Sequence, residues 1–201
     1  DTLRKFISYY KPYKHLFFAD MTCALILSGI DLAFPLIVRY LLDEVYLLPD
    51  KNEMLRIIFY VGGAMLLMYI VRYFCQYFIT SWGHIMGARM EADMRNDLFN
   101  HFQKLSFSYY DKNNTGEMMS KLVNDLFDIT ELAHHGPENI FISILKIVGS
   151  FTLLMMLNVK MTLILLAVTA VMLIFSVSMN LKMKAVFMDN RVKIAKVNAS
   201  L

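Results

Sequence analysis

The chain has 201 residues, of which 57% are hydrophobic and 18% are charged, and its formal net charge at pH 7 is +3. This hydrophobic share is higher than that of a typical soluble domain, and the excess lies in long runs, which excludes an ordinary soluble fold. Residues 161–181 contain no charged side chain over 21 positions, which is enough helix to cross a hydrocarbon core of about 30 Å. Apolar runs with one charged residue each cover 21–38, 57–82 and 140–157. The sequence therefore predicts an all-α membrane protein with four long transmembrane helices.

The two cysteines, Cys23 and Cys75, both lie within the apolar runs. Two such thiols do not indicate a disulfide framework. The first residues lack the uninterrupted apolar core and the small-residue cleavage site of a signal peptide, so we expect none there.

Residues 1–11 have the pattern of a short amphipathic helix. Leu3, Phe6 and Ile7 share one face, and basic residues lie beside it. We expect an interfacial helix on the inner leaflet of the membrane, with a frayed terminus as the alternative. Pro12 has no N–H group and separates this helix from the first span.

The first span, predicted over 14–46, contains an ionisable residue, Asp31, four positions before Pro35. Charged groups at membrane depth usually face a bundle interior or a wet cavity, so Asp31 is a candidate functional residue. The alternative is a simple proline kink in which the Asp31 side chain either extends toward the membrane surface or pairs with Arg39. Pro35 leaves a backbone carbonyl without its helical partner and is a candidate hinge.

The second span begins near Met54, after a short turn at 47–53, and its helical pattern continues to about Leu105. A helix of about 78 Å is far longer than a bilayer requires. Gly83 and Gly87 predict close packing against a neighbouring helix. Polar and aromatic residues three or four positions apart form one stripe, made of Tyr69, Arg72, Tyr73, Gln76, Thr80 and His84. The stripe predicts either a hydrated cavity or hydrogen bonding between helices.

Residues 104–125 are polar and aromatic, although they lie between long apolar segments. Asn114 and Gly116 have the chemistry of a tight turn. Before the turn, Tyr109 and Tyr110 provide large amphipathic rings. The segment predicts a sharp reversal between two long helices, which is either an ordinary loop or a surface that presses against a partner.

A third helix is predicted over 117–157, polar in its first half and apolar in its second, where Lys146 lies. Gly136 and Pro137 within it make a candidate hinge. Two carboxylates and two imidazoles lie on adjacent turns of the polar half: Glu131, His134, His135 and Glu138. Glu-x-x-His is a spacing known from carboxylate-bridged metal sites. One such motif on one helix is a weak signal, so we expect a wet, polar helix surface and no metal site.

Asn158 and Val159 predict a minimal turn, and the fourth span runs over 160–201 in a helical pattern that continues to the last residue.

Lysine and arginine are unevenly distributed around the spans. Fourteen lie before the first span, between the second and third, or after the fourth, whereas Lys51, Arg56 and Lys160 lie on the opposite side. Because the basic side of a membrane protein faces the cytoplasm, we expect both ends of the chain and the central loop to be cytoplasmic. The sequence thus predicts a multi-pass protein of the cell membrane whose helices extend into the cytoplasm.

The segment 95–125 carries a motif of recognisable order. A helix ends in Tyr109-Tyr110-Asp111, a polar turn follows, and then come Thr115-Gly116-Glu117, Ser120-Lys121 and Asn124-Asp125. This order resembles the transmembrane domain of ABC exporters of the multidrug and lipid type, although that family more often has arginine where Lys121 stands. The resemblance covers nearly all 201 residues, and residues 1–11 resemble the family's elbow helix. It implies the N-terminal part of such a domain, without its last two spans and its nucleotide-binding domain.

The resemblance implies the membrane-spanning part of an ATP-driven exporter, coupled to a nucleotide-binding domain through the 105–116 loop. The implied coupling residues are Tyr109, Tyr110, Asp111, Lys112, Asn113 and Asn114. The candidates for the translocation path are Asp31, Arg72, Tyr73, Gln76 and Lys146, and the candidate hinges are Pro35, Gly136 and Pro137. We expect no catalytic residue and no cofactor in this stretch, because it contains no glycine-rich phosphate loop, and we expect no metal because the single motif on residues 131–138 is weak. ATP and Mg²⁺ are expected in the nucleotide-binding domain.

The expected partners are membrane lipid, the nucleotide-binding domain, a second transporter half and a hydrophobic or amphipathic substrate, but no nucleic acid. The sequence does not separate a homodimer from a heterodimer, or a drug from a lipid or a peptide as cargo. The alternative function is a non-transporting membrane module, such as the span bundle of a sensor or an assembly scaffold. Such a module would need a sustained heptad pattern in its cytoplasmic helices, and residues 83–105 have none.

Overall fold

The computed structural model describes residues 2–112 and 114–199, and every secondary-structure element in these residues is helical. The helices are α1 (Thr2–Ser8), α2 (Lys14–Tyr40), α3 (Lys51–Phe102), α4 (Phe107–Lys112), α5 (Thr115–Ser120), α6 (Leu126–Leu157) and α7 (Val159–Ala199). A 3₁₀ turn, Lys11–Tyr13, joins α1 to α2, and π-helical segments at Leu41–Val45 and Lys121–Asp125 follow α2 and precede α6. The chain divides into a first compact unit that ends at Gly149 and a second that begins at Ser150.

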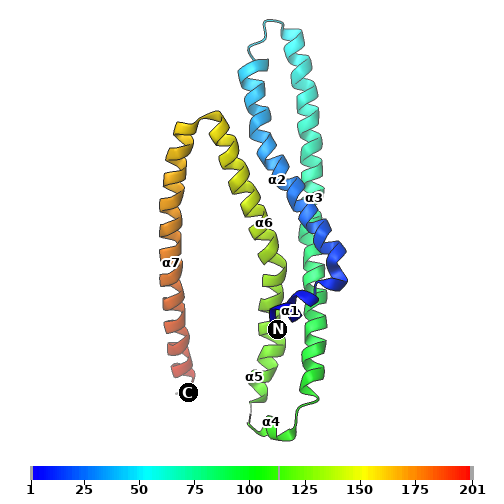
Figure 1. The fold of residues 1–201 in the computed structure, drawn as a ribbon, viewed down its shortest axis with the longest axis vertical. Helices are drawn as coiled ribbons and strands as arrows, with labels where there is room; N and C mark the ends of the chain where they lie inside the picture. Colours follow the sequence, from blue (N-terminus) through cyan, green and yellow to red (C-terminus); the bar gives the residue numbers. More distant parts are fainter. Residues whose placement is uncertain (1, 113, 200–201) are drawn as a thin grey trace. The chain divides into compact units, whose positions relative to one another are not determined.

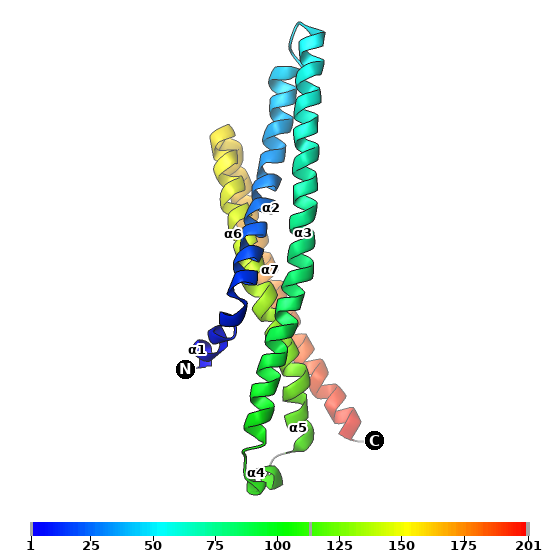
Figure 2. The ribbon, with the colours of Figure 1, turned by 90° about the vertical axis from the view of Figure 1, so that its right-hand side faces the viewer.

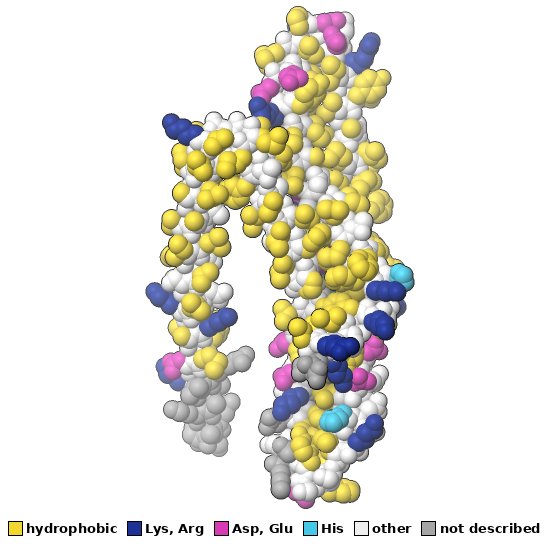
Figure 3. Space-filling model, in the orientation of Figure 1, with side chains coloured by type: hydrophobic (Ala, Val, Ile, Leu, Met, Phe, Trp, Pro, Cys, Tyr) yellow, Lys and Arg dark blue, Asp and Glu magenta, His cyan; other side chains and the backbone are white. Residues whose placement is uncertain are grey.

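Four helical stretches are long and apolar enough to cross a membrane: Leu3–Val45, Lys51–Phe102, Met118–Leu157 and Val159–Asn190. Hydrocarbon offers no partner for backbone N–H and C=O groups, so continuous helices are the expected way to cross it. On the first unit, hydrophobic side chains cover most of the middle of the face in Figure 3, while charges gather toward its two ends. The predicted fold class, an all-α membrane protein with four long spans, is confirmed.

The first unit is built around an antiparallel pair of helices, α2 and α3, which run side by side in Figures 1 and 2. Ala24 and Leu27 of α2 pack on Ile79 of α3, and all three are buried. Phe141 and Ile142 of α6 cover this cluster. The core therefore joins three helices that are far apart in sequence.

Helix α1 and the turn after it are anchored by tyrosines. The Tyr9 hydroxyl donates to Asp97 Oδ2 at 2.7 Å, and the Tyr13 hydroxyl donates to Asp93 Oδ2 at 2.8 Å, both on α3. The Tyr10 hydroxyl donates to the Ala133 carbonyl of α6. Helix α1 is shorter than the predicted 1–11, and its position at the membrane surface stays a prediction.

Capping explains why α3 starts earlier than predicted. The Asp50 side chain accepts a hydrogen bond from the Asn52 backbone N–H at 2.9 Å, so the helix begins at Lys51 and not near Met54. It also ends earlier, at Phe102, because the next residues form tight turns that include a bond from the Leu105 N–H to the Phe102 carbonyl.

Caps also set the starts of α5 and α7. The Asn114 side chain accepts from the Gly116 N–H at 2.8 Å, and α5 begins at Thr115, two residues before the predicted start. In the second unit, the predicted turn at Asn158 is present, and its side chain accepts from the Met161 N–H at 3.1 Å at the start of α7.

The buried methionines of α3 provide a test of this packing. Met90 is 0% exposed and lies in a cluster with Met86 and Ala133, which is covered by Phe6 of α1 and by aromatic residues of the segment after it. Met90→Ala should reduce the free energy of unfolding by about 2–5 kcal/mol, because it leaves a cavity where α1, α3 and α6 meet. The matched control Met119→Ala, at a residue that is 54% exposed, should cost less than about 1 kcal/mol. Equilibrium denaturation in detergent measures both values, and equal losses would contradict this packing.

Candidate functional site

Three ionisable side chains from different helices meet at one point of the first unit. Arg72 Nε of α3 donates to Asp31 Oδ1 of α2 at 2.8 Å, and Lys146 Nζ of α6 lies 2.7 Å from Asp31 Oδ2. The three side chains are only 26% to 39% exposed. We call these residues the Asp31 cluster. Two cations against one carboxylate leave the cluster with one net positive charge, and the pairing reduces the cost of holding these charges at membrane depth.

A cavity of about 650 Å³ adjoins the Asp31 cluster. Its lining residues come from one face of α2 with the segment after it, and from α3: Asp31, Phe34, Pro35, Val38, Arg39, Leu42, Asp43, Tyr69 and Arg72. Mostly apolar walls with a few convergent polar groups are typical of sites for small molecules.

Arg39 does not pair with Asp31. Its Nε donates instead to Asp43 Oδ2 at 2.9 Å, one helical turn further along. The alternative in which Asp31 pairs with Arg39 is therefore wrong. A partner four residues away on the same helix is within reach, whereas Asp31 is engaged by two cations from other helices.

The other two path candidates lie away from the Asp31 cluster. The Tyr73 side chain is 66% exposed, and its ring packs edge-on against that of Phe74 at 5.7 Å. Gln76 Nε2 donates to Thr80 Oγ1 at 3.4 Å and lines a separate cavity further along α3. The predicted stripe thus does not form one surface, because Tyr73 is rotated by about 100° from its neighbour Arg72, and Gln76 lies one turn further along the helix.

Helix α4 forms the reversal between α3 and α5. The Tyr110 hydroxyl donates to the Phe102 carbonyl at 2.6 Å, which fastens α4 to the end of α3. The Tyr109 and Tyr110 rings meet edge-on at 6.1 Å, and Asp111 is exposed. Phe107, which was not among the predicted contact residues, is 90% exposed. A short helix fixed to its neighbour therefore presents aromatic and acidic groups outward.

The structure does not fully describe two of the predicted coupling residues. Asn113 lies outside the described residues, and so does the side chain of Lys112.

Both helices that contain predicted hinges continue through them. Pro35 lies inside α2, and Pro137 lies inside α6 directly after Gly136. Their role as hinges stays a prediction.

Sequence patterns did not predict the two π-helical segments, a type of irregularity that often occurs at functional sites.

A second polar group lies between α2, α3 and α6. The predicted polar surface of α6, with His134, His135 and Glu138, is met by His84 of α3 and by Asp20 of α2. Asp20 is 2% exposed, and sequence reasoning missed it because it stands at the edge of an apolar run. Imidazoles and carboxylates are groups that could hold a metal ion.

A family model and individual known proteins all match this chain as part of one type of membrane protein. A family model described as the ABC transporter transmembrane region matches residues 17–201. The chain is 43% identical over 185 residues to YwjA of Bacillus subtilis (strain 168), which is named as an uncharacterized ABC transporter ATP-binding protein. This match covers 92% of the chain and 32% of YwjA. It is 30% identical over 168 residues to YgaD of the same strain, named as a candidate multidrug export ATP-binding/permease protein, covering 81% of this chain and 28% of YgaD. A similarly named protein of Staphylococcus aureus (strain NCTC 8325 / PS 47) is 27% identical over 167 residues, which are 80% of this chain and 28% of that protein. The chain thus spans about a third of the length of these relatives.

The Asp31 cluster can be tested by removing its only carboxylate. Asp31→Asn leaves Arg72 and Lys146 facing each other without a carboxylate. The free energy of unfolding should fall by about 1–3 kcal/mol, which lies between the cost of breaking an exposed ion pair and that of breaking a buried one. Asp43→Asn breaks the exposed pair with Arg39 and should cost less than about 1 kcal/mol. Denaturation of both variants in detergent gives the comparison. A loss no greater for Asp31→Asn than for the control would contradict a role for the cluster in holding the three helices.

Proposed function

This chain belongs to the family of ABC transporter transmembrane regions, and we propose on that basis that it forms part of the membrane-spanning path of an ATP-driven exporter. Four long apolar helices and the family match establish a multi-pass membrane protein. The observation that carries the exporter proposal is the match of residues 17–201, together with relatives named for multidrug export. The proposed partners are membrane lipid, a nucleotide-binding domain that holds ATP and Mg²⁺, a second transporter half, and a hydrophobic or amphipathic substrate.

We assign the coupling role to the 105–116 loop, with α4 at its centre. The relatives are named as ATP-binding, and about two thirds of their length lies beyond the region they share with this chain. A force from an ATP-binding domain needs a rigid point of entry, and the bond from Tyr110 to the Phe102 carbonyl supports such a point. Outward groups on α4, among them Phe107 and Asp111, are available for contact. Movement of α4 would then be carried by α3 and by the helical run that leads into α6.

We assign the substrate path to the cavity beside the Asp31 cluster. Apolar walls suit a hydrophobic body, and the net positive charge of Asp31, Arg72 and Lys146 suits an acidic or polar head group. Opening and closing of the path would require α2, α3 and α6 to change their packing, with bending at Pro35 or at Gly136–Pro137.

The coupling role is tested by Tyr110→Ala/Asp111→Ala in the intact protein. Removing both groups frees α4 from α3 and removes an outward charge, so transport into proteoliposomes should fall by about tenfold, a typical size for coupling between sites. ATP hydrolysis should continue and should no longer respond to substrate. The matched control Tyr46→Ala/Glu53→Ala removes one tyrosine and one carboxylate at the other end of α3, and it should transport normally. Normal coupling in the Tyr110/Asp111 variant would contradict the assignment.

The orientation is tested with single cysteines and a membrane-impermeant maleimide. Phe107 and Leu47 are both strongly exposed, at 90% and 72%, and lie near opposite ends of α3. Phe107→Cys should react only in inside-out vesicles and Leu47→Cys only in right-side-out vesicles, because the basic segments should be cytoplasmic. Reaction in the opposite vesicles would place α4 outside the cell and overturn both the orientation and the coupling proposal.

A further inference from the structure

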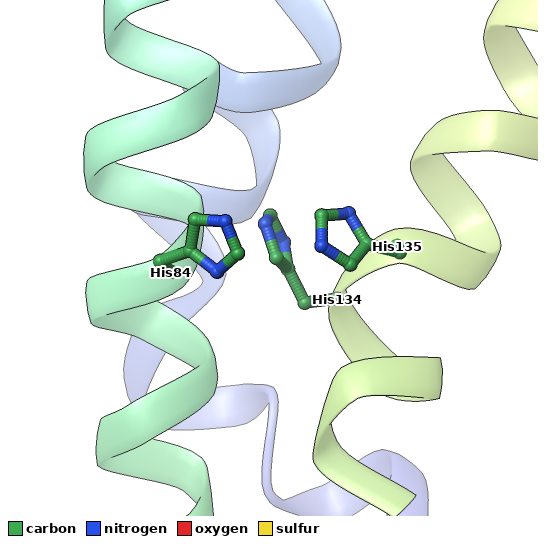
Figure 4. A group of neighbouring side chains, drawn as sticks. All are labelled: His84, His134 and His135. Atoms are coloured by element: carbon green, nitrogen blue, oxygen red, sulfur yellow. The ribbon is translucent and has the colours of Figure 1, made fainter. Parts of the chain in front are cut away.

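Three histidines converge where α3 and α6 meet. His84 extends from α3, and His134 and His135 extend from α6, with the His134 ring between the other two (Figure 4). The ring centroids lie 4.5 to 5.2 Å apart. One nitrogen from each ring lies within 4.8 Å of the others. Three of the chain's five histidines are thus brought to one point.

Two carboxylates adjoin the same imidazole. Asp20 of α2, His134 and Glu138 each offer a ligand atom within 4.8 Å of the other two. These three residues are only 2%, 4% and 7% exposed. The group therefore combines acidic and imidazole ligands from three helices in a mostly buried position.

Four buried polar atoms of this group lack hydrogen-bond partners among the described residues. They are Asp20 Oδ1, both ring nitrogens of His134, and Glu138 Oε2. The nearest approaches, 3.9 Å from His134 Nε2 and 3.7 Å from His135 Nδ1 to Glu138 Oε2, are too long for hydrogen bonds. Burying polar atoms without partners destabilises a fold, so this concentration of them points to a ligand that they bind.

The His134 ring lies directly against Gly83 of α3. A Cβ atom added at Gly83 of α3 would collide with the His134 imidazole. Glycine at this position therefore allows the ring to lie against the α3 backbone. A cavity of about 440 Å³, lined among others by Gln76, Thr80 and His84, gives access to the group.

We propose that Asp20, His84, His134, His135 and Glu138 form a binding site for one divalent transition-metal ion of the zinc class, which we call the histidine site. The three imidazoles and Glu138 supply a tetrahedral set of the nitrogen and oxygen ligands that zinc takes. One nitrogen of each imidazole now lies within 4.8 Å of the other two, and Glu138 Oε2 lies 3.9 Å from His134 Nε2. Around an ion with bonds of about 2.0–2.1 Å, these ligand atoms would approach one another to about 3.3 Å by side-chain rotation. Asp20 then accepts from the His134 nitrogen that does not bind the ion, as carboxylates commonly do behind metal-bound histidines.

The bound ion would connect α2, α3 and α6 at a single level. Along α3 it would lie at His84, between Arg72 of the Asp31 cluster and Asp93, which accepts from Tyr13. The histidine site does not depend on the proposed transport function, since only the ligand set and its burial define it.

The site is tested in the intact protein, in lipid nanodiscs and without a histidine tag. Co²⁺ is the first probe, because tetrahedral Co²⁺ absorbs visible light much more strongly than hydrated, octahedral Co²⁺. The intact protein should produce the tetrahedral spectrum, and Zn²⁺ should abolish it by displacement. An octahedral spectrum only, or none, would overturn the proposal, and this result needs no variant.

Matched variants locate the ion. His84→Asn/His135→Asn removes two proposed ligands, and His15→Asn/His101→Asn removes two histidines that are exposed and outside the group. After equilibrium dialysis, metal analysis should show one Zn²⁺ per chain fewer for the first variant than for the intact protein, and no loss for the second. Equal zinc content in all three proteins, or equal losses in the two variants, would overturn the proposal.

Gly83→Ala provides a second variant that leaves every ligand in the sequence. It displaces the His134 ring, so it should weaken zinc binding by more than about tenfold, as changes around metal ligands do. Unchanged affinity in Gly83→Ala would contradict the assigned position of His134.

Thermal unfolding gives an independent measurement. Zn²⁺ should raise the melting temperature of the intact protein and of the His15/His101 variant, but not of the His84/His135 variant.

Discussion

The length of one helix governs the first unit. Helix α3 has 52 residues and is about 78 Å long, whereas the hydrocarbon core of a bilayer is about 30 Å thick. Its backbone hydrogen bonds are made within the helix, so it remains a continuous rod in lipid and in water alike. The buried cores of the first unit both include α3 residues, through Ile79 in one and through Met86 and Met90 in the other.

Polar contacts recur along this rod at intervals. Arg72 meets Asp31, His84 meets the histidines of α6, and Asp93 and Asp97 accept from tyrosines at the start of the chain. Such contacts set the register between helices in a way that apolar packing alone does not, because lipid is as apolar as a leucine side chain. A change in the packing of α3 would therefore exchange or break specific bonds, which is how a small displacement at one end of a helix becomes a switch between two arrangements.

Much of this architecture could be predicted from the sequence, since long uncharged runs leave few alternatives to membrane-spanning helices. Errors in the helix ends came from single side chains such as Asp50, whose capping bond adds three residues to the start of α3. Contacts between helices were not predictable in the same way. Asp31 could have paired with Arg39 on its own helix, and only the fold shows that Arg72 and Lys146 reach it. The local pattern of α6 indicated His134, His135 and Glu138, but Asp20 and His84 join them from positions more than forty residues away, which no local pattern could show.

We propose α4 as the point at which an ATP-binding domain acts on these helices. Its most direct test is a photocrosslinking amino acid placed at position 107 in the intact protein in membranes, followed by mass spectrometry of the crosslinked peptides. If α4 contacts the ATP-binding domain, crosslinks to peptides of that domain are expected. Crosslinks confined to lipid, or to residues 1–201, would contradict it.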